Sequence, residues 1–391
     1  MKPLSGITVL ELGMVLQAPL AAQMLGDYGA DVIKIERAPR GDIMRDLDEV
    51  GSGRGEMSCY HAAVGRNKRT LCLDIKSPSG QEVLRELIRG ADVLIHNFRP
   101  GVMERLGFSY DEVRELNPRL VYGASYAFGS TGPYAGFPGQ DMLAQSLSGF
   151  AFNGVDPGEP PRLTSTPVVD YASAASLAQG ILAALYGRER TGKGDLVTTS
   201  LFDVALAMQL LEISSRSLYD YKTEWLKYSF IFPTKDGWLT ILTLFRDNPL
   251  KQLCEAFEVD DMSREPDLAD ASLQRENAEK VYERFGDVMK RYTTDECVER
   301  LGRTDILFAP ALDLDEAMQH PQTEENGVLW EIPVPGHGTV KLGGNPVRLN
   351  GAPPDVTIPP SGLGEMSDEV LEAFGYNQGE IDALRERGVI R

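Results

Sequence analysis

The chain has 391 residues, of which 42% are apolar and 25% charged, which excludes an intrinsically disordered protein and is enough for one large or two ordinary domains. The formal net charge is −19, and residues 111–391 carry all of it, with 25 Lys and Arg against 44 Asp and Glu. Because so acidic a chain repels nucleic acid, we expect no nucleic-acid partner.

The first third of the chain predicts strands that alternate with helices. Short apolar or alternating runs predict five strands: Ile7–Leu12, Ala30–Glu36, Thr70–Asp74, Asp92–His96 and Leu120–Ala124. Amphipathic or helix-like segments separate several of them: Pro19–Tyr28, Ser79–Arg89 and Asp111–Leu116. This alternation predicts an α/β fold with a Rossmann-like, doubly wound parallel sheet.

The remainder predicts mainly helices and a second unit. Helical patterns cover Met142–Ser148, Tyr171–Tyr186 and roughly Leu201–Tyr221, and a hairpin-like run at Phe230–Leu242 opens a smaller α+β unit. From Thr339 the tail is Pro- and Gly-rich extended chain, followed by helices near Ser367–Phe374 and Gly379–Arg387. We place a large domain at 1–226 with a linker helix at 201–221, a small domain at 227–335, and a C-terminal segment at 336–391.

Other features of the sequence predict the compartment of the protein and exclude several kinds of partner. Met1–Leu12 has no cationic stretch before an apolar run, so we expect no secretory signal. The longest uncharged stretch, Leu120–Gln140, has five glycines and two prolines, unlike a bilayer-spanning helix. The four cysteines form no CxxC pair and the four histidines have no metal-binding spacing. We therefore expect a cytoplasmic protein with no membrane partner, disulfide scaffold or metal.

Two nucleotide-binding motifs are incomplete. The turn after the first predicted strand, Glu11–Leu16, has one glycine where a dinucleotide site needs three, so we expect no NAD. Gly187–Gly194 nearly matches a phosphate-binding P-loop, but position 194 lacks the hydroxyl and the segment follows a helix. It is better interpreted as a helix C-terminus, with Arg188 and Arg190 near the negative end of the dipole.

Two carboxylates stand alone in long uncharged stretches. Asp141 is the only charge between Leu120 and Val155, and Asp170 is the only one between Leu163 and Gly187. Each precedes a helical pattern, and helix capping is the usual explanation, which we keep for Asp141. Asp170 follows apolar residues and precedes small ones, which leaves room for a ligand at the helix start. A carboxylate there can be either a cap or a covalent nucleophile.

A locally basic segment interrupts the neutral first part of the chain. Residues 60–110 hold eight cations against five anions, including Arg66, Lys68, Arg69, Lys76, Arg99 and Arg105. Such a segment is either a solvated surface or a site for one small polyanion.

Ordered motifs along nearly the whole chain resemble those of the class III CoA-transferases, the family of formyl-CoA transferase and carnitine CoA-transferase. The motifs are Val9–Gly13 with Gln17–Pro19, Leu25–Arg37, Arg66–Arg69, Leu73–Lys76, Asn97–Gly101, Glu104–Gly107, Asn117–Leu120, Gly129–Tyr134, Gly180–Leu185, Arg190–Gly194, Pro359–Pro360 and Gly364–Glu365. The resemblance implies an interlocked homodimer whose large domain combines both chain ends. It also implies acyl-CoA as substrate with no tightly bound cofactor.

The resemblance assigns roles to single positions. The nucleophilic aspartate of the family falls on Asp170, and Gln17 and Ala18 fall on the loop that meets the thioester. The positions that would hold CoA are Arg37, Leu73, Asp74, Lys76, Asn97, Phe98, Arg99, Arg105 and Gln140, beside Gln17 and Ala18. CoA's phosphates need cations, which agrees with the basic segment.

The implied reaction moves CoA from an acyl-CoA to a carboxylic acid through an aspartyl-CoA thioester, without ATP or metal. Oxyanions need fixed donors, and we expect the backbone N–H groups after Asp170 to supply them. The donor and the acceptor stay open.

Three differences from the family's pattern bear on alternative functions. Racemases of this fold, which act on 2-methylacyl-CoA, carry a catalytic histidine at the position of Gln140, and glutamine cannot exchange a proton near neutral pH. Oxalate-specific members carry four glycines in the small domain, where Leu242–Asn248 has none, which argues against oxalate. Phe245 and Arg246 either face the acceptor or form ordinary surface. The last alternative is a non-catalytic acyl-CoA-binding dimer, in which Asp170 only caps its helix.

Overall fold

The computed structural model describes residues 2–37, 39–48, 57–156, 158–220 and 225–391, which form two compact units. The larger unit combines the chain up to Leu210 with Gly327–Arg391, and the smaller unit holds Leu211–Asn326. Both boundaries lie earlier in the chain than the expected ones after 226 and 335. One reason is that the Arg66 guanidinium holds the C-terminal segment, because it donates to the Gly343 carbonyl at 2.8 Å and lies over the Trp330 ring.

One parallel sheet organises the larger unit. Its strands, within the described residues, run in the order β3-β2-β1-β4-β5-β6, as predicted for a doubly wound fold. Val9 of the central strand pairs with Val32 on one side and with Val93 on the other. The bounds are β1 Thr8–Glu11, β2 Asp31–Glu36, β3 Lys68–Cys72, β4 Val93–His96, β5 Val121–Tyr126 and β6 Leu196–Ser200.

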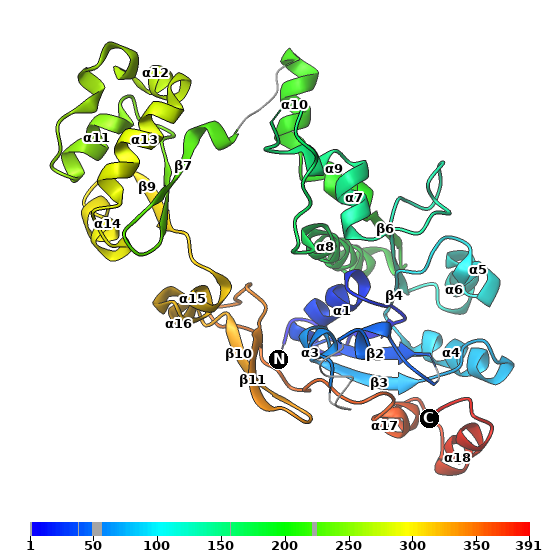
Figure 1. Ribbon diagram of the computed structural model, residues 1–391. Coiled ribbons are helices and arrows are strands. Elements are labelled where there is room, and N and C mark those ends of the chain that lie inside the picture. The colour runs from blue at the N-terminus through cyan, green and yellow to red at the C-terminus, as the bar shows by residue number, and fades with distance from the viewer. Residues whose placement is uncertain (1, 38, 49–56, 157, 221–224) are drawn as a thin grey trace. The chain divides into compact units, whose positions relative to one another are not determined.

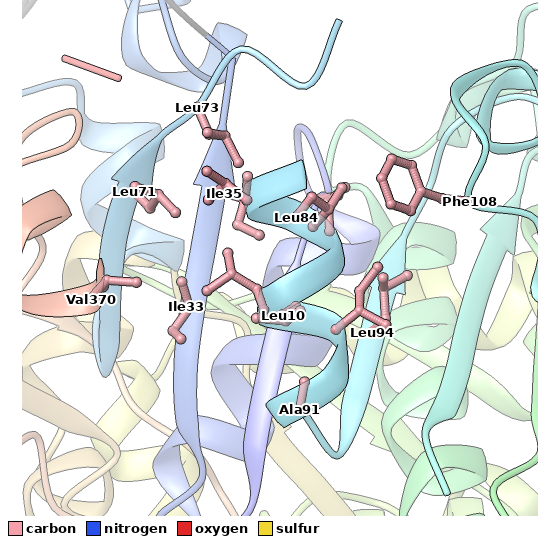
Figure 2. Packing of buried hydrophobic residues seen from close by; sticks show 14 of the residues in the cluster. Leu10, Ile33, Ile35, Leu71, Leu73, Leu84, Ala91, Leu94, Phe108 and Val370 are labelled. Carbon is pink, nitrogen blue, oxygen red and sulfur yellow. The ribbon is translucent and has the colours of Figure 1, made fainter. Parts of the chain in front are cut away.

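Both faces of this sheet are covered, because side chains alternate between two cores. Leu10, Ile33 and Leu94 join one cluster with α4 (Pro78–Gly90) and α6 (Tyr110–Leu116), and Figure 2 shows them beside Leu84 of α4. The residues that precede them, Val9, Val32 and Val93, join a second cluster with α1 (Gln17–Asp27) and α8 (Val168–Thr191).

Local signals explain where α4 begins and how it packs. Ser77 accepts a hydrogen bond from the Gly80 N–H at 3.0 Å, and Pro78 opens the helix. The apolar residues Val83, Leu84, Leu87 and Ile88 are buried, each stabilising the fold by roughly 1.5–3 kcal/mol relative to an exposed position. The remaining helices of this unit are α3 Cys59–Val64, α5 Val102–Leu106, α7 Asp141–Leu147 and α9 Leu201–Ala207.

The C-terminal segment returns to the edge strand β3. Val370 of α17 (Ser367–Ala373) lies beside Leu71 in Figure 2, and Figure 1 shows α17 and α18 (Gln378–Glu386) near β3. The Asp74 N–H donates to the Val389 carbonyl at 2.8 Å. The two chain ends therefore share one core.

The smaller unit is α+β. Its described strands form an antiparallel sheet, β7-β8-β9, in which the hairpin predicted over Phe230–Leu242 is confirmed. Helices pack their apolar faces on this sheet around Phe232, Phe257 and Phe285. The bounds are β7 Ser229–Pro233, β8 Trp238–Leu242, β9 Leu307–Pro310, α10 Leu210–Tyr219, α11 Pro249–Ala256, α12 Ala271–Glu276, α13 Ala278–Met289, α14 Thr294–Leu301, α15 Leu314–Gln319 and α16 Pro321–Asn326.

Some elements differ from the prediction. The expected helix over Leu201–Tyr221, whose last residue lies outside the described part, breaks near Gln209, whose N–H bonds to Leu206 instead of continuing the i−4 ladder. A hairpin that was not predicted joins β10 (Leu329–Val334), in the range expected as the small domain, to β11 (Gly338–Gly343), where extended chain was expected from Thr339. The segment like a P-loop is a helix C-terminus, as interpreted, because Gly192 caps α8 with φ +67°.

Candidate active site

The carboxyl ends of four parallel strands meet around a pocket of about 460 Å³. β1 lies between β2 and β4, so the strand order reverses there, and ligands of such sheets bind outside this switch point. The lining residues follow the strand ends: Leu12–Met14 after β1, Ile35–Arg37 and Pro39–Asp42 at and after β2, Leu73–Lys76 after β3, and Phe98, Val102 and Leu106 after β4.

Five of the residues predicted to hold CoA line this pocket: Arg37, Leu73, Asp74, Lys76 and Phe98. Leu73 and Phe98 form apolar wall, whereas Arg37 and Lys76 are exposed. Arg40 adds a cation that the sequence prediction missed, although it lies next to the Leu25–Arg37 motif. The pocket therefore combines an apolar wall with cations.

Three other predicted residues lie outside the pocket lining. Asn97 binds the loop after β1, because its Oδ1 accepts from the Met14 N–H at 2.9 Å and its Nδ2 donates to the Met14 carbonyl at 2.7 Å. Arg99 and Arg105 are exposed. Asn97 thus contacts the pocket through Met14. Arg99 and Arg105 are not among the residues that line the pocket.

The loop after β1 leads from the pocket to Gln17. Val15 adopts φ +66°, a left-handed conformation rare for a β-branched residue, and its N–H donates to Asp42 Oδ1 at 3.1 Å. From Met14 to Gln17 the chain spans at most roughly 11 Å. Gln17 opens α1 and is buried, and Ala18 packs in the core with 0% of its surface exposed. Ala18 therefore has neither backbone nor side chain exposed in this structure.

Asp170 is the third residue of α8, and the nearby Gln17 side chain favours the ionised form of its carboxyl group. Its carboxyl group is mostly buried. Burial, and then the negative charge of Asp141, raise the pKa of Asp170 from 3.8 to about 7, although the Gln17 donor opposes the rise. Asp170 does not line the pocket at the strand ends, but a carboxyl group perturbed in this way is a candidate for chemistry.

Asp141 caps a helix, but not the one expected. It is the first residue of α7, and its carboxylate reaches α8, where Oδ2 accepts from the N–H groups of Val169 at 2.7 Å and Asp170 at 2.9 Å. Gln145 donates to the other oxygen at 2.5 Å. The sequence pattern predicts that Asp141 caps the helix that directly follows it, whereas the fold brings its carboxylate to the start of α8.

The same contacts correct the expected oxyanion donors. The N–H groups of Val169 and Asp170 bind Asp141, and the Tyr171 N–H donates to the Pro167 carbonyl. After Tyr171 the N–H groups belong to the interior of α8, where each is used by the helix. The Gln17 side chain is a candidate donor beside Asp170, because it lowers the pKa of that carboxyl group.

The family model of CoA-transferase family III matches residues 4–366 of this chain. The chain belongs to CoA-transferase family III. It is 31% identical to an acyl-CoA transferase of Fusarium pseudograminearum, over 99% of this chain and 88% of that protein. It is also 31% identical to the acetyl-CoA:oxalate CoA-transferase of Acetobacter aceti, over 89% of this chain and 90% of that protein.

A solved structure shares this fold. The Mycobacterium tuberculosis protein Rv3272 superposes with a TM-score of 0.82 at 29% identity, covering 94% of this chain and 98% of that one. The resemblance read from the motifs is thus confirmed, and the protein is an enzyme of the CoA-transferase class.

The CoA-transferase fold also buries a charge network that the sequence prediction missed. Lys34 Nζ lies 2.7 Å from Glu11 and 2.9 Å from Asp42, and Lys68 Nζ lies 2.7 Å from the other Glu11 oxygen. All four side chains are nearly inaccessible to solvent. The sequence did contain a signal for this network, namely a lysine or glutamate inside an apolar strand. Such a charge is buried, and a buried charge needs a partner. The network fixes Asp42, which in turn holds Val15.

The sequence also singled out Gln140 and the pair Phe245 and Arg246, which take no part in the contacts described above. Gln140 is exposed at the N-cap position of α7, where its side chain makes no capping hydrogen bond. In the smaller unit, Phe245 is 83% exposed with φ +63°, and Arg246 donates to its carbonyl at 2.9 Å.

The described residues also bear on metal and membrane binding. Among them, no group of three or more His, Cys, Asp or Glu side chains could hold a metal ion. One helix in that part of the chain, α8, is long and apolar enough to span a membrane. Its buried side chains pack in the core with α1, as expected for a core helix.

Proposed function

We propose that this CoA-transferase moves CoA from an acyl-CoA donor to a carboxylic acid through a thioester on Asp170. The observation that carries the proposal is the mostly buried Asp170 carboxyl group, whose pKa is lowered by the side chain of Gln17. Gln17 follows the loop after β1, part of which lines the pocket. A carboxylate with little water around it is a stronger nucleophile than an exposed one, since less solvation is lost on attack.

The pocket at the strand ends is our candidate for the nucleotide part of CoA. Arg37, Arg40 and Lys76 would meet the phosphates, and Leu73 and Phe98 would pack on the base. Arg99 and Arg105 would add positive potential from the surface. In this assignment Asn97 shapes the loop through Met14.

The reaction balances without ATP. The Asp170 carboxylate attacks the acyl carbonyl and releases CoA thiolate, which leaves a mixed anhydride. The thiolate then attacks the aspartyl carbonyl, so that the donor leaves as a carboxylate and Asp170 carries CoA as a thioester. The acceptor carboxylate attacks this thioester, and the released thiolate attacks the acceptor carbonyl to form the new acyl-CoA and free Asp170.

The Gln17 side chain is the proposed donor to the oxygen of Asp170 during these steps. It already favours the ionised carboxylate, and its amide N–H can follow the charge that develops on that oxygen. Because the nucleophile must be ionised, the pKa of about 7 predicts that kcat/KM rises with pH through that region.

The acceptor class is a carboxylic acid. The name of the Acetobacter relative includes oxalate, whereas the Leu242–Asn248 loop lacks glycine, so oxalate belongs in a panel with larger and more apolar acids. We propose transfer in preference to racemisation, because Gln140 offers no proton-transfer group. Deuterium exchange at the α-carbon of a branched acyl-CoA would contradict this choice.

We also propose the interlocked homodimer. It is supported by α10, in which no residue is buried although Leu211, Ile213 and Leu218 are apolar. Apolar surface on this scale is typical of an interaction site. Light scattering should give twice the chain mass at micromolar concentration, and a stable folded monomer would contradict the proposal.

The deciding experiment traps the intermediate. Incubation with an acyl-CoA donor and no acceptor should leave CoA attached to the peptide that contains Asp170, and hydroxylamine should release it. Asp170→Asn should fold but transfer nothing. Turnover by Asp170→Asn, checked for deamidation, or CoA attached to another peptide would show that the nucleophile lies elsewhere.

A further inference from the structure

The carboxylate of Asp42 connects two segments that line the pocket. Asp42 belongs to the segment after β2, and its Oδ1 accepts a hydrogen bond at 3.1 Å from the Val15 N–H, in the loop after β1. The same oxygen accepts from the Met44 N–H at 3.1 Å, and the Asp42 N–H donates to Glu36 Oε1 at 3.0 Å. The direction of each bond is unambiguous, because a backbone N–H can only donate.

Lys34 holds the other oxygen of this carboxylate. Lys34 Nζ donates to Asp42 Oδ2 at 2.9 Å. It also donates to Glu11 at 2.7 Å and to the Gly13 carbonyl at 3.2 Å. An ammonium group has three N–H donors, so each donor has its own acceptor here. The side chains of Lys34 and Asp42 are nearly inaccessible, so water does not replace a lost partner, and the network holds Asp42 in one position.

Side chains bind two consecutive peptide groups of the loop after β1. Lys34 binds the carbonyl that precedes Met14, and Asn97 binds both the N–H and the carbonyl of Met14. Asp42 binds the next N–H, that of Val15. Val15 has φ +66°, a conformation that a β-branched residue keeps only where its surroundings impose it. Asp42 supplies one of the contacts that impose it.

We propose that Asp42 is a positioning residue, which holds the loop after β1 in the shape that binds CoA. The proposal rests on the proposed assignment of the pocket to CoA. Leu12–Met14 of this loop and Pro39–Asp42 both line the pocket. A single carboxylate bonded to both segments fixes them relative to each other before a ligand arrives. Binding then loses no affinity to the ordering of the loop.

The first test measures the affinity for CoA itself by titration calorimetry, without an acyl group or an acceptor. Asp42→Ala should weaken binding roughly tenfold, since the apparent affinity falls with the fraction of molecules whose loop has the binding shape. Asp27→Ala is the matched control, because Asp27 is also buried and lies 2.8 Å from a cation, Arg66, but does not line the pocket. Its affinity should match that of the unchanged protein. If Asp42→Ala does not fold, Lys34→Met combined with Asp42→Ala removes the cation together with the carboxylate and should show the same loss.

A glycine at position 15 tests how Asp42 acts. Glycine adopts a positive φ without steric cost, so a loop with Val15→Gly depends less on the contact with Asp42. In this background Asp42→Ala should lower the affinity for CoA by a smaller factor than it does when Val15 is present. An equal factor in both backgrounds would mean that the two residues act independently, as they would if Asp42 touched CoA directly, and would overturn the positioning role.

Hydrogen exchange without ligand separates this proposal from the assignment of the pocket. The peptide that contains Met14 and Val15 should exchange faster in Asp42→Ala, and at the original rate in Asp27→Ala. Unchanged exchange in Asp42→Ala would overturn the positioning role, as would unchanged affinity for CoA in Asp42→Ala when Arg37→Ala weakens binding. Faster exchange, with the affinity unchanged in both Asp42→Ala and Arg37→Ala, would support positioning of the loop and refute the pocket as the CoA site.

Discussion

Asp170→Asn should make the protein more stable at alkaline pH while it abolishes transfer. Burial and Asp141 raise the pKa of Asp170 to about 7, so ionising this group costs more in the folded protein than in the unfolded chain. With the folded pKa above the unfolded value near 3.8, the stabilising contribution is fully present below pH 3.8 and is lost as pH rises through 7. Asparagine carries no charge and avoids this loss.

The magnitude follows from the size of the pKa rise. A rise from 3.8 to about 7, at about 1.4 kcal/mol per pH unit, corresponds to roughly 4 kcal/mol above pH 7, as an upper limit. Since 1 kcal/mol moves the melting temperature of a large domain by roughly 2 °C, Asp170→Asn should melt up to about 8 °C higher at pH 8.5. At pH 4 the difference should be near zero, because both side chains are then neutral in the folded protein.

The assay is thermal unfolding of both proteins from pH 4 to pH 8.5. Asp203→Asn is the matched control, because Asp203 is also the third residue of its helix, α9, but is exposed. Its difference from the unchanged protein should not grow between pH 5 and 8.5. If the Asp170→Asn difference fails to grow over that range, or has the opposite sign, burial does not oppose ionisation and our account of the nucleophile is wrong.

Other substitutions test separate parts of the site. Asp141→Asn removes the second-largest cause of the raised pKa of Asp170, so the kcat/KM profile should move to lower pH; a move to higher pH would refute the charge argument. Gly13→Ala would place a Cβ 2.6 Å from Ala18 Cβ, so we expect a loss of roughly 1–3 kcal/mol by denaturant unfolding together with lower kcat; unchanged values would show that the loop adjusts freely. Arg37→Ala should raise KM for acyl-CoA with kcat unchanged, and the effect should shrink in high salt; a change confined to kcat would place CoA elsewhere.

Elements with a strong local signal could be predicted from the sequence. β2 was recognisable because Asp31–Glu36 is apolar at nearly every second position, and α4 because one face is apolar and Ser77 caps it. β6 was missed, because Leu196–Ser200 is short and only half-apolar, and pairing with β5 stabilises it. The break between α9 and α10 was missed because the Gln209 amide donates to the carbonyls of Ala205 and Ser148, a contact that no periodicity contains.

The candidate site also has one part that the sequence predicted and another that it could not predict. Asp170 drew attention through isolation in an uncharged stretch, which is a property of sequence. The side chains around Asp170 come from distant parts of the chain. Asp141 accepts a hydrogen bond from the N–H of Val169, 28 positions away, and Ser125 donates to Gln17, 108 positions away. Periodicity and spacing report neighbours on one element, so capping was the interpretation of Asp141, whereas Asp170 stayed open between a cap and a covalent nucleophile. The fold instead couples them, because Asp141 binds the start of α8 and its charge raises the pKa of Asp170. The two isolated aspartates of the sequence are therefore coupled in the fold: the first binds the start of α8, and its charge makes the second more costly to ionise.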